Sequence, residues 1–486
     1  DPDVIRVEDT YYMVSTTMHF MPGCEILQSF DLVHWEHVTY VYETLDHTDA
    51  QQLKSGQNIY GQGMWAASLR YHEGRFYICF VANDTRKTYL YTSEKIDGPW
   101  KKQLIEGFYH DGSLLFDEDG RNYIVYGNDE IWITELNEDL TAPKKDGLHR
   151  LLVSDHKNPE LGYEGSHIQK INGYYYIFLV HSLRDRWMRT EACFYSDSLE
   201  GEFTGGDVLC DDRGYCGQGV AQGGIVDTPD GKWYAMLFQD SGAVGRLPIL
   251  LPVTWKDHFP VFGQNGHVPE EIEVHSTRPG YIYQPLVGSD DFCNGLLPRW
   301  QFNHDPDPQY YHLDALQGTY TITTREVCTE LTQAVNTLTQ RMSYPSCAAE
   351  VTVDASALKD GDVAGLCAFQ GCYAAVGITK HHGKYEVLML DKKEDGILDM
   401  TEGTVVESHQ MDFRLEADFC NMKDEARCYY RVNKGDWLPI GTVHKLYFKL
   451  DHFTGCRFGL FCYAAEETGG SACFRDFKYY DVDEIS

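Results

Sequence analysis

A unit that occurs five times in the first half of the chain constrains its fold more than any other feature of the sequence. Each unit reads as a short strand, a turn such as Asn172-Gly173, and a return strand rich in aromatic residues. Successive units start about 45 to 65 residues apart, which suits four strands with their turns. Because one such unit cannot bury its faces alone, the sequence predicts an all-β chain whose first domain is a five-bladed β-propeller. The units start at Asp1, Trp65, Asp111, Glu164 and Gln222.

The repeat ends near Gly263, and the remainder of the chain has a different pattern. Residues 266–287 are unrepeated and contain several prolines, which is typical of a linker. Longer alternating strand patterns follow, such as GTYTITT and KYEVLML, and these favour a sandwich of two sheets. With 486 residues the chain also exceeds the usual size of one domain. We expect a propeller at 1–265, a linker at 266–287 and a β-sandwich at 288–486.

The charge balance argues against two classes of partner. The chain has 41 basic and 74 acidic residues, and its net charge of -33 opposes binding to nucleic acid or to an anionic membrane surface. It contains no run of 18 apolar residues that would span a membrane. The 15 cysteines are scattered singly, which favours a reduced, cytoplasmic protein. Because Asp1 opens directly on a strand pattern, we expect the native chain to begin earlier.

The first residues of the five units are the candidate site. In a propeller they start the innermost strands, which converge on the axis, so their side chains face one small volume. Three of these residues are carboxylic acids, and crowding raises the pKa of at least one of them. Glycoside hydrolysis needs a protonated acid and a carboxylate, and a third acid can set their pKa values apart. The alternatives are that Asp before Gly is turn chemistry, or that the axis holds water or an ion.

Several motifs in order resemble one family of enzymes. They are DPDVIRVEDTYYMVST, SFDLVHW, GMWAASLRYHEGRFY, YHDGSLLFDEDGRNYIV, YEGSHIQKINGYYYI and AQGGIVDTPDGKWY. Together they are similar to the family 43 glycoside hydrolases, and the resemblance covers residues 1 to about 265. It implies a five-bladed propeller, an inverting mechanism and no cofactor for catalysis. The C-terminal part resembles the concanavalin-like β-sandwich of the family's xylosidase and arabinofuranosidase branch.

The resemblance also implies a role for each acid. Asp1 would be the general base, Asp111 would orient its partner and tune its pKa, and Glu164 would be the general acid. Asp3 is the rival for the base, although the alignment of the units favours Asp1. Inversion predicts that the carboxyls of Asp1 and Glu164 lie roughly 6.5 to 9.5 Å apart, whereas about 5 Å would indicate retention.

Five further residues are candidates for substrate binding. We expect Trp65 to floor the sugar site, and His19 and Phe20 to shape its rim, with a plain surface loop as the alternative for His19. Gln222 stands where many relatives carry a His near a central ion, which puts a central calcium in doubt. Arg246 would bond sugar hydroxyls or hold Asp1, and a structural ion pair is the alternative. The loop Ser182 to Arg189 is expected to line the leaving-group side.

Asp291 and Asp476 lie near the two ends of the predicted sandwich and are candidates for a structural Ca²⁺. Solvated acids in a turn are the alternative. The function expected is exo-acting release of terminal α-L-arabinofuranosyl groups, or of β-D-xylosyl ends, from arabinoxylan or xylan fragments. The competing hypothesis is a propeller that binds carbohydrate without turnover.

Overall fold

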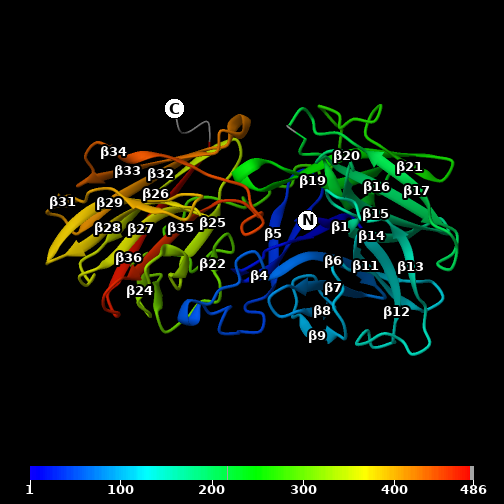
Figure 1. The fold of residues 1–486 in the computed structure, drawn as a ribbon, viewed down its shortest axis with the longest axis horizontal. Helices are drawn as coiled ribbons and strands as arrows, with labels where there is room; N and C mark the ends of the chain where they lie inside the picture. The colour runs from blue at the N-terminus through cyan, green and yellow to red at the C-terminus, as the bar shows by residue number, and fades with distance from the viewer. Residues whose placement is uncertain (216, 482–486) are drawn as a thin grey trace.

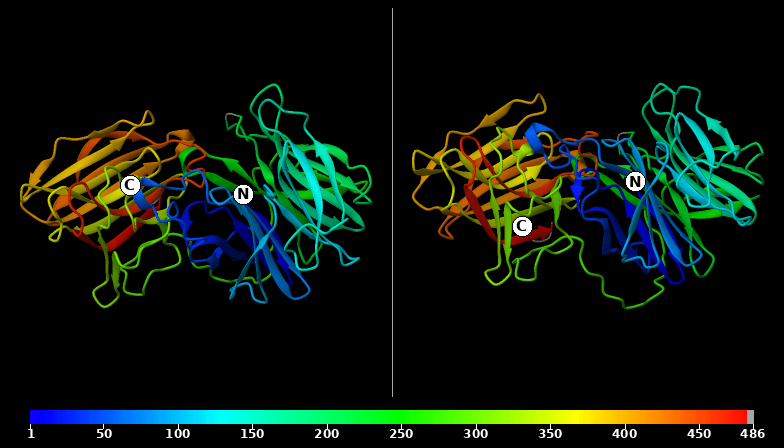
Figure 2. Two further views of the ribbon diagram at one scale, coloured as in Figure 1. Left: turned by 60° about the horizontal axis from the view of Figure 1, so that its bottom comes forward. Right: turned by 90° about the horizontal axis from the view of Figure 1, so that it is seen from below.

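The computed structural model describes residues 1–215 and 217–481, so the last five residues of the predicted second domain lie outside the described part. Two β-rich domains lie side by side (Figure 1). The N-terminus lies near the junction of the two domains, and it keeps this position in the further views of Figure 2. The residue predicted to be the general base therefore lies where the domains meet.

The first domain is made of five four-stranded sheets, and the predicted five-bladed propeller is confirmed. Each blade is an antiparallel meander whose strands follow one another in the chain, apart from the short β3 within the first blade. The blades are β1 (Asp3–Val7), β2 (Thr10–Ser15), β4 (Gly23–Ser29) and β5 (Glu36–Tyr42); β6 (Met64–His72), β7 (Arg75–Ala82), β8 (Lys87–Ser93) and β9 (Lys101–Ile105); β10 (Ser113–Phe116), β11 (Asn122–Asn128), β12 (Glu130–Leu136) and β13 (His149–Ser154); β14 (Glu164–Ile171), β15 (Tyr174–Ser182), β16 (Arg189–Ser196) and β17 (Thr204–Leu209); and β18 (Ala221–Asp227), β19 (Trp233–Asp240), β20 (Arg246–Lys256) and β21 (Phe259–Phe262).

Local sequence explains the inner hairpin of each blade. Asn172 and Gly173 both have positive φ angles, 50° and 85°, as the two central residues of a tight hairpin turn between β14 and β15 require. The aromatic return strand β15 is then buried over almost its whole length. In this blade the Asn172-Gly173 turn and the alternating apolar residues fix the register of β14 against β15.

Apolar side chains between neighbouring blades form the core of the propeller. Val4 and Met13 of the first blade, for example, pack in one cluster with Val226 and Met236 of the fifth. This contact closes the ring without a covalent link, and the ion pair of Arg6 with Asp227 reinforces it. The innermost strands β1, β6, β10, β14 and β18 contact one another around the axis. Residues at equivalent positions of these strands are therefore brought together.

The second domain packs a nine-stranded sheet against a seven-stranded sheet around one large apolar core. The nine-stranded sheet holds β3 (Phe20–Met21), β22 (Gln301–Asn303), β25 (Leu338–Arg341), β35 (Arg457–Ala464), β27 (Asp362–Phe369), β28 (Ala374–His381), β29 (Lys384–Lys392), β30 (Leu398–Met400) and β31 (Thr404–Val406). The seven-stranded sheet holds β23 (Tyr311–Asp314), β24 (Thr319–Thr323), β36 (Ser471–Asp481), β26 (Ser346–Asp354), β32 (Gln410–Asp418), β33 (Glu425–Val432) and β34 (Leu438–Lys445). Short 3-10 turns lie at Lys54–Gly56, Gly242–Val244, Leu331–Gln333 and Cys420–Met422. The predicted two-sheet sandwich is confirmed.

The strand β3 belongs to the propeller by sequence but to the sandwich by pairing, since Phe20 and Met21 pair with Asn303 and Phe302. This pairing corrects the prediction that His19 and Phe20 shape the rim of the sugar site. Both side chains are fully buried between the domains, where His19 packs against Phe20 and the rings of Tyr60, His304 and His452. A strand partner from nearly 300 residues away is not visible in the local sequence.

Between β21 and β22 the chain has no regular strand and runs along the first blade. The backbone N–H of Phe30 donates to the Tyr283 hydroxyl, and Arg278 forms an ion pair with Asp9. This segment therefore packs on the propeller as well as connecting the domains.

Two further expectations concern the whole chain. All cysteines that the structure describes are free. Over the same described residues, no helix has the length and apolar character needed to cross a membrane.

Candidate active site

The structure brings the five predicted first residues to the starts of the innermost strands. Asp1 and Asp111 lie two residues before β1 and β10, Glu164 begins β14, and Trp65 and Gln222 are the second residues of β6 and β18. The backbone N–H of Gly165 donates to Asp111 Oδ2 at 3.0 Å, which links the third and fourth blades. Side chains from several blades therefore converge at one end of the propeller axis.

Asp111 and Glu164 share one partner, His110. The His110 Nε2 atom lies 3.5 Å from Asp111 Oδ2 and 3.4 Å from Glu164 Oε2. The Asn128 side-chain amide donates to Glu164 Oε2 at 2.7 Å. Sequence reasoning missed His110 and Asn128, although one directly precedes Asp111 and the other is a polar residue at the end of β11. The two acids and their imidazole form a single coupled set.

The pKa values of Asp111 and Glu164 are shifted in opposite directions. Burial, together with the nearby charge of Glu164, raises the pKa of Asp111 above its ordinary value despite the opposing charge of His110. Burial also acts to raise the pKa of Glu164, but the hydrogen bond and charge of His110 and the charges of Arg189 and Arg246 outweigh it and lower that pKa. The charge of Asp111, with smaller contributions from Glu164, raises the pKa of His110 to about 9. Glu164 and Asp111 are close enough for one acid to raise the pKa of the other, as the sequence predicts. In the free site the raised pKa is that of Asp111, and not that of Glu164, the proposed general acid.

Asp1 is held by different groups. Arg246 Nη1 donates to its Oδ1 atom at 2.5 Å, and the Thr16 hydroxyl donates to its Oδ2 atom at 2.5 Å. Arg246 also donates from Nε to Asp240 Oδ1 at 3.1 Å. Arg246 therefore fixes Asp1 in place, as one of the two predicted roles for it requires.

Asp3, the rival for the base, is occupied entirely by structural contacts. It is 1% exposed, and one of its oxygens accepts from Leu69 N at 2.7 Å and from Arg70 at 2.8 Å. The other lies 3.0 Å from His167 Nδ1. Burial would raise the pKa of Asp3, but Arg70 and His167 lower it overall. Asp3 ties three blades together and offers no free oxygen to a substrate.

The walls of the site come from both domains. Arg246 lies between two rings, with its guanidinium carbon 4.5 Å from the centre of Phe238 and 4.2 Å from that of Phe453. Phe453 belongs to the sandwich and also meets Trp65 edge to face at 5.5 Å. Sequence reasoning missed Phe453 because nothing local shows that a loop about 190 residues beyond the propeller reaches the acids. The Trp65 ring lies 6.2 Å from the His110 ring, and its role as the floor of the sugar site stays a prediction.

Gln222 is buried, and it sits in the left-handed region with a φ of 69°. Its N–H donates to Glu191 Oε2 at 2.7 Å, and burial raises the pKa of Glu191 well above its ordinary value. A Cβ atom on Gly165 would lie only 2.6 Å from the Gln222 side chain. Gln222 therefore packs directly against the backbone that follows Glu164.

The structure shows the surroundings of the two acids proposed to hold Ca²⁺ and of one other group of potential ligands. Asp291 and Asp476 are both exposed, and neighbouring Asp290 uses its two oxygens to accept from Phe292 N and the Trp300 indole. Within residues 1–215 and 217–481, the one close group of three such ligands is His110, Asp111 and Glu164, with ligand atoms within 4.8 Å. The predicted Ca²⁺ at Asp291 and Asp476 stays a prediction.

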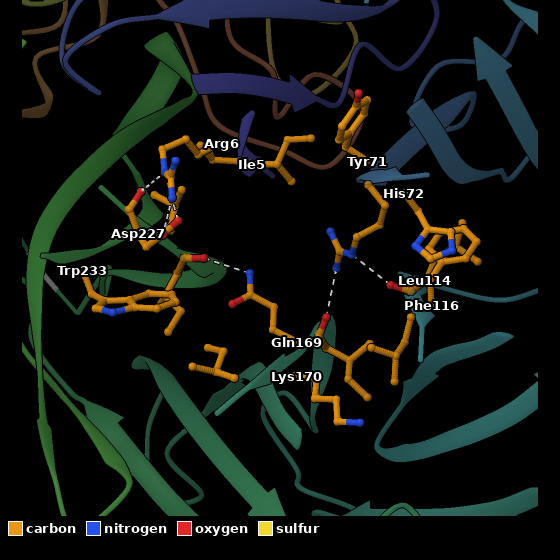
Figure 3. A pocket seen from close by; sticks show the side chains of 17 residues that line it. Ile5, Arg6, Tyr71, His72, Leu114, Phe116, Gln169, Lys170, Asp227 and Trp233 are labelled. Carbon is orange, nitrogen blue, oxygen red and sulfur yellow. Dashed lines mark hydrogen bonds and ion pairs between the residues drawn. The ribbon is translucent and has the colours of Figure 1, made fainter. Parts of the chain in front are cut away.

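A hollow of about 410 Å³ lies among the far ends of the same innermost strands (Figure 3). None of the three predicted catalytic acids lines it. Its cations are already paired: Arg6 with Asp227, Arg70 with Asp3 at 2.8 Å, and Lys170 with Asp117 at 2.7 Å. This far mouth has no free charge with which to bind a ligand.

Comparison with known proteins gives matches over nearly the whole chain. The family model described as glycosyl hydrolases family 43 matches residues 1–260, and the beta xylosidase C-terminal concanavalin A-like domain matches residues 289–480. The concanavalin-like character predicted for the sandwich is thereby confirmed.

Individual relatives agree with these matches. The chain is 26% identical to a "Beta-xylosidase" of Formosa agariphila over 99% of this chain and 87% of the relative. It is 24% identical to a "Xylosidase/arabinosidase" of Butyrivibrio fibrisolvens over 100% and 97%. A solved structure described as "Bifunctional GH43-CE" of Bacteroides eggerthii has 42% identity and a TM-score of 0.91. It covers all of this chain, which spans 62% of the length of that structure's chain.

Proposed function

The chain belongs to family 43 of the glycosyl hydrolases, and we propose that it is an exo-acting, inverting enzyme that releases terminal pentosyl residues from xylan-type oligosaccharides. The observation that carries the proposal is the unequal support of three carboxyls at one end of the axis. Asp1 is bound by a guanidinium and a hydroxyl, whereas Asp111 and Glu164 share an imidazole. Inverting hydrolysis requires two carboxyl groups in such different environments.

In this mechanism Glu164 donates its proton to the glycosidic oxygen as the carbon–oxygen bond breaks. A water molecule forms the new bond to the anomeric carbon and gives its proton to Asp1. A sugar that fills the site excludes water from Glu164, which adds to the burial that already acts to raise its pKa. Asp111 holds Gly165 by its backbone N–H and so positions the neighbouring Glu164.

The separation of the acid and the base belongs to the same proposal. Inversion leaves room for the attacking water, so the Asp1 and Glu164 carboxyls are expected roughly 6.5 to 9.5 Å apart in the complex with substrate. Phe453 from the sandwich stands against Trp65 and Arg246, which favours a closed pocket for a chain end over an open groove.

The released sugar is proposed to be α-L-arabinofuranosyl or β-D-xylosyl. The names of the matched relatives include both activities, since one is a "Beta-xylosidase" and another a "Xylosidase/arabinosidase". Both sugars are neutral, which suits a site where Arg246, Arg189 and His110 balance the charges of the acids.

The test is release of 4-nitrophenol from the α-L-arabinofuranoside and the β-D-xyloside by wild type and by Glu164→Ala. Wild type should cleave at least one of them, and the variant should lose most of that activity. Proton NMR of the first product formed should show the inverted anomer. A wild-type protein that binds oligosaccharide but releases no sugar would support the carbohydrate-binding alternative instead, and a retained anomer would overturn inversion.

A further inference from the structure

Arg189, the first residue of β16, has donors that the fold leaves unused. The side chain is 5% exposed, and its Nε and Nη1 atoms are buried without a hydrogen bond. The nearest acid is Asp240, whose Oδ2 atom lies 3.4 Å from Nε. Buried polar groups are nearly always satisfied in native proteins, and buried N–H donors without an acceptor are expensive. Two orphan donors beside an active site therefore indicate a partner that arrives with the substrate.

The second guanidinium of the site makes the contrast clear. Arg246 donates to both Asp1 and Asp240 and is engaged on two sides. Arg189 shares Asp240 with it but has no comparable second acid. Burial lowers the pKa of Arg189, while Asp240, and more weakly Glu164 and Asp111, act to raise it again. Arg246 thus holds Asp1, whereas Arg189 contacts only Asp240 among the acids of the site and comes from the same blade as Glu164.

An aromatic surface accompanies the free donors. The guanidinium carbon of Arg189 lies 5.7 Å from the centre of the Trp187 ring, and Trp187 is 38% exposed. The tight connection between β15 and β16 fixes this ring in place. Ser182 Oγ accepts from Met188 N at 2.8 Å, and Leu183 N donates to Met188 O at 3.1 Å. An exposed ring beside a few placed donors is the combination by which protein sites bind sugars.

We propose that Trp187 and Arg189 bind the sugar unit that leaves when the glycosidic bond is cleaved. Trp187 stacks on that unit, and Arg189 donates to its hydroxyl oxygens. Glu164, which would protonate the leaving oxygen, belongs to the same blade as this pair, whereas Asp1 and Arg246 come from the first and fifth blades. The assignment rests on the proposed function, because it requires that water attacks on the Asp1 side and that the leaving sugar departs on the Glu164 side.

The experiment compares two substrates that release the same pentose. One is a linear xylo-oligosaccharide, or its arabinosylated form if wild type releases arabinose, and the other is the matching glycosyl fluoride. Fluoride needs no binding site for a leaving sugar. Arg189→Met and Trp187→Ala should each lower kcat/KM on the oligosaccharide by about 10- to 100-fold, the usual loss for a missing charged hydrogen bond or stacked ring. The loss on the glycosyl fluoride should be at least about fivefold smaller for each variant.

Arg75→Ala, on the second blade, is the matched control. Its side chain is 46% exposed and pairs with Glu94, so both substrates should be cleaved at the wild-type rate. Arg189→Lys should recover part of the activity on the oligosaccharide. Equal losses on both substrates, or no loss on the oligosaccharide, would overturn the assignment. If Arg189→Met does not fold, Trp187→Ala carries the test alone, because Trp187 is 38% exposed and its loss should disturb the fold less.

Failure of the proposed function gives a different result. Wild type would then cleave neither the fluoride nor the oligosaccharide, whatever the variants do.

Discussion

The two ends of the propeller axis are built from the same five strands and have opposite chemistry. The far mouth holds a hollow of about 410 Å³ (Figure 3), and the ion pairs described above bind its cations to acids of the protein. The end that carries Asp1 and Glu164 has two carboxyls on one imidazole and a guanidinium with unused donors. Polar groups that lack a hydrogen-bond partner within the protein, rather than the size of a hollow, distinguish the end suited to chemistry.

The strongest test of this contrast is Asp1→Asn. Loss of a general base should lower kcat on aryl pentosides by about 10² to 10⁴-fold, because the amide cannot accept the proton of the attacking water. At the far mouth, Gln169→Leu should leave kcat within about twofold of wild type, since its side-chain amide donates only to a backbone carbonyl. Comparable losses in the two variants would break the distinction between the ends.

Asp3→Asn should damage stability rather than chemistry. It leaves the largely buried Arg70 without its counter-charge, and breaking a buried pair costs about 3 to 5 kcal/mol. Urea denaturation measures the free energy of unfolding, and kcat per folded molecule should change far less than in Asp1→Asn. A selective loss of kcat at unchanged stability would instead make Asp3 the base.

A pH series sharpens the description of the end that carries Asp111 and Glu164. The pKa of His110 is raised in the folded state to about 9 from an ordinary value near 6.5. Its stabilising contribution should therefore be complete below about pH 6.5 and be lost as the pH rises through about 9. The difference in unfolding free energy between wild type and His110→Gln should shrink over that range. A difference that is flat or grows with pH would contradict the charged contact with Asp111 and Glu164.

The smallest effect is expected for Arg6→Gln at the far mouth. Its partner Asp227 is 38% exposed at the side chain, and such ion pairs contribute about 1 kcal/mol or less. Thermal unfolding should shift only slightly, and cleavage of the aryl pentosides should not change. A large loss of activity would show that the far mouth takes part in function.

Features that depend on neighbouring residues could be predicted from the sequence. Turns such as Asn172-Gly173 and the alternating strands predict the five blades, and the equivalent starts of the units bring Asp1, Asp111 and Glu164 to one end of the axis. The direction of the pKa shifts was less accessible. It depends on His110, which the alignment of the units passed over, and the raised pKa falls on Asp111.

Errors arose where distant segments meet. The sequence predicts His19 and Phe20 at the rim because their backbone partners, His304 and Asn303, are invisible from nearby residues. Phe453 was missed for the same reason, since the loop that holds it comes from the other domain. Long-range pairing leaves no periodic signal in the chain that it joins.

The shared strand β3 also governs how the protein must be handled. A chain cut after the propeller would strip Phe20 and Met21 of their partners and leave the sandwich sheet with a bare edge at β22. Such an edge recruits strands from other molecules. The two modules therefore form one indivisible unit in heterologous expression, and half-length fragments are expected in inclusion bodies rather than as working catalysts.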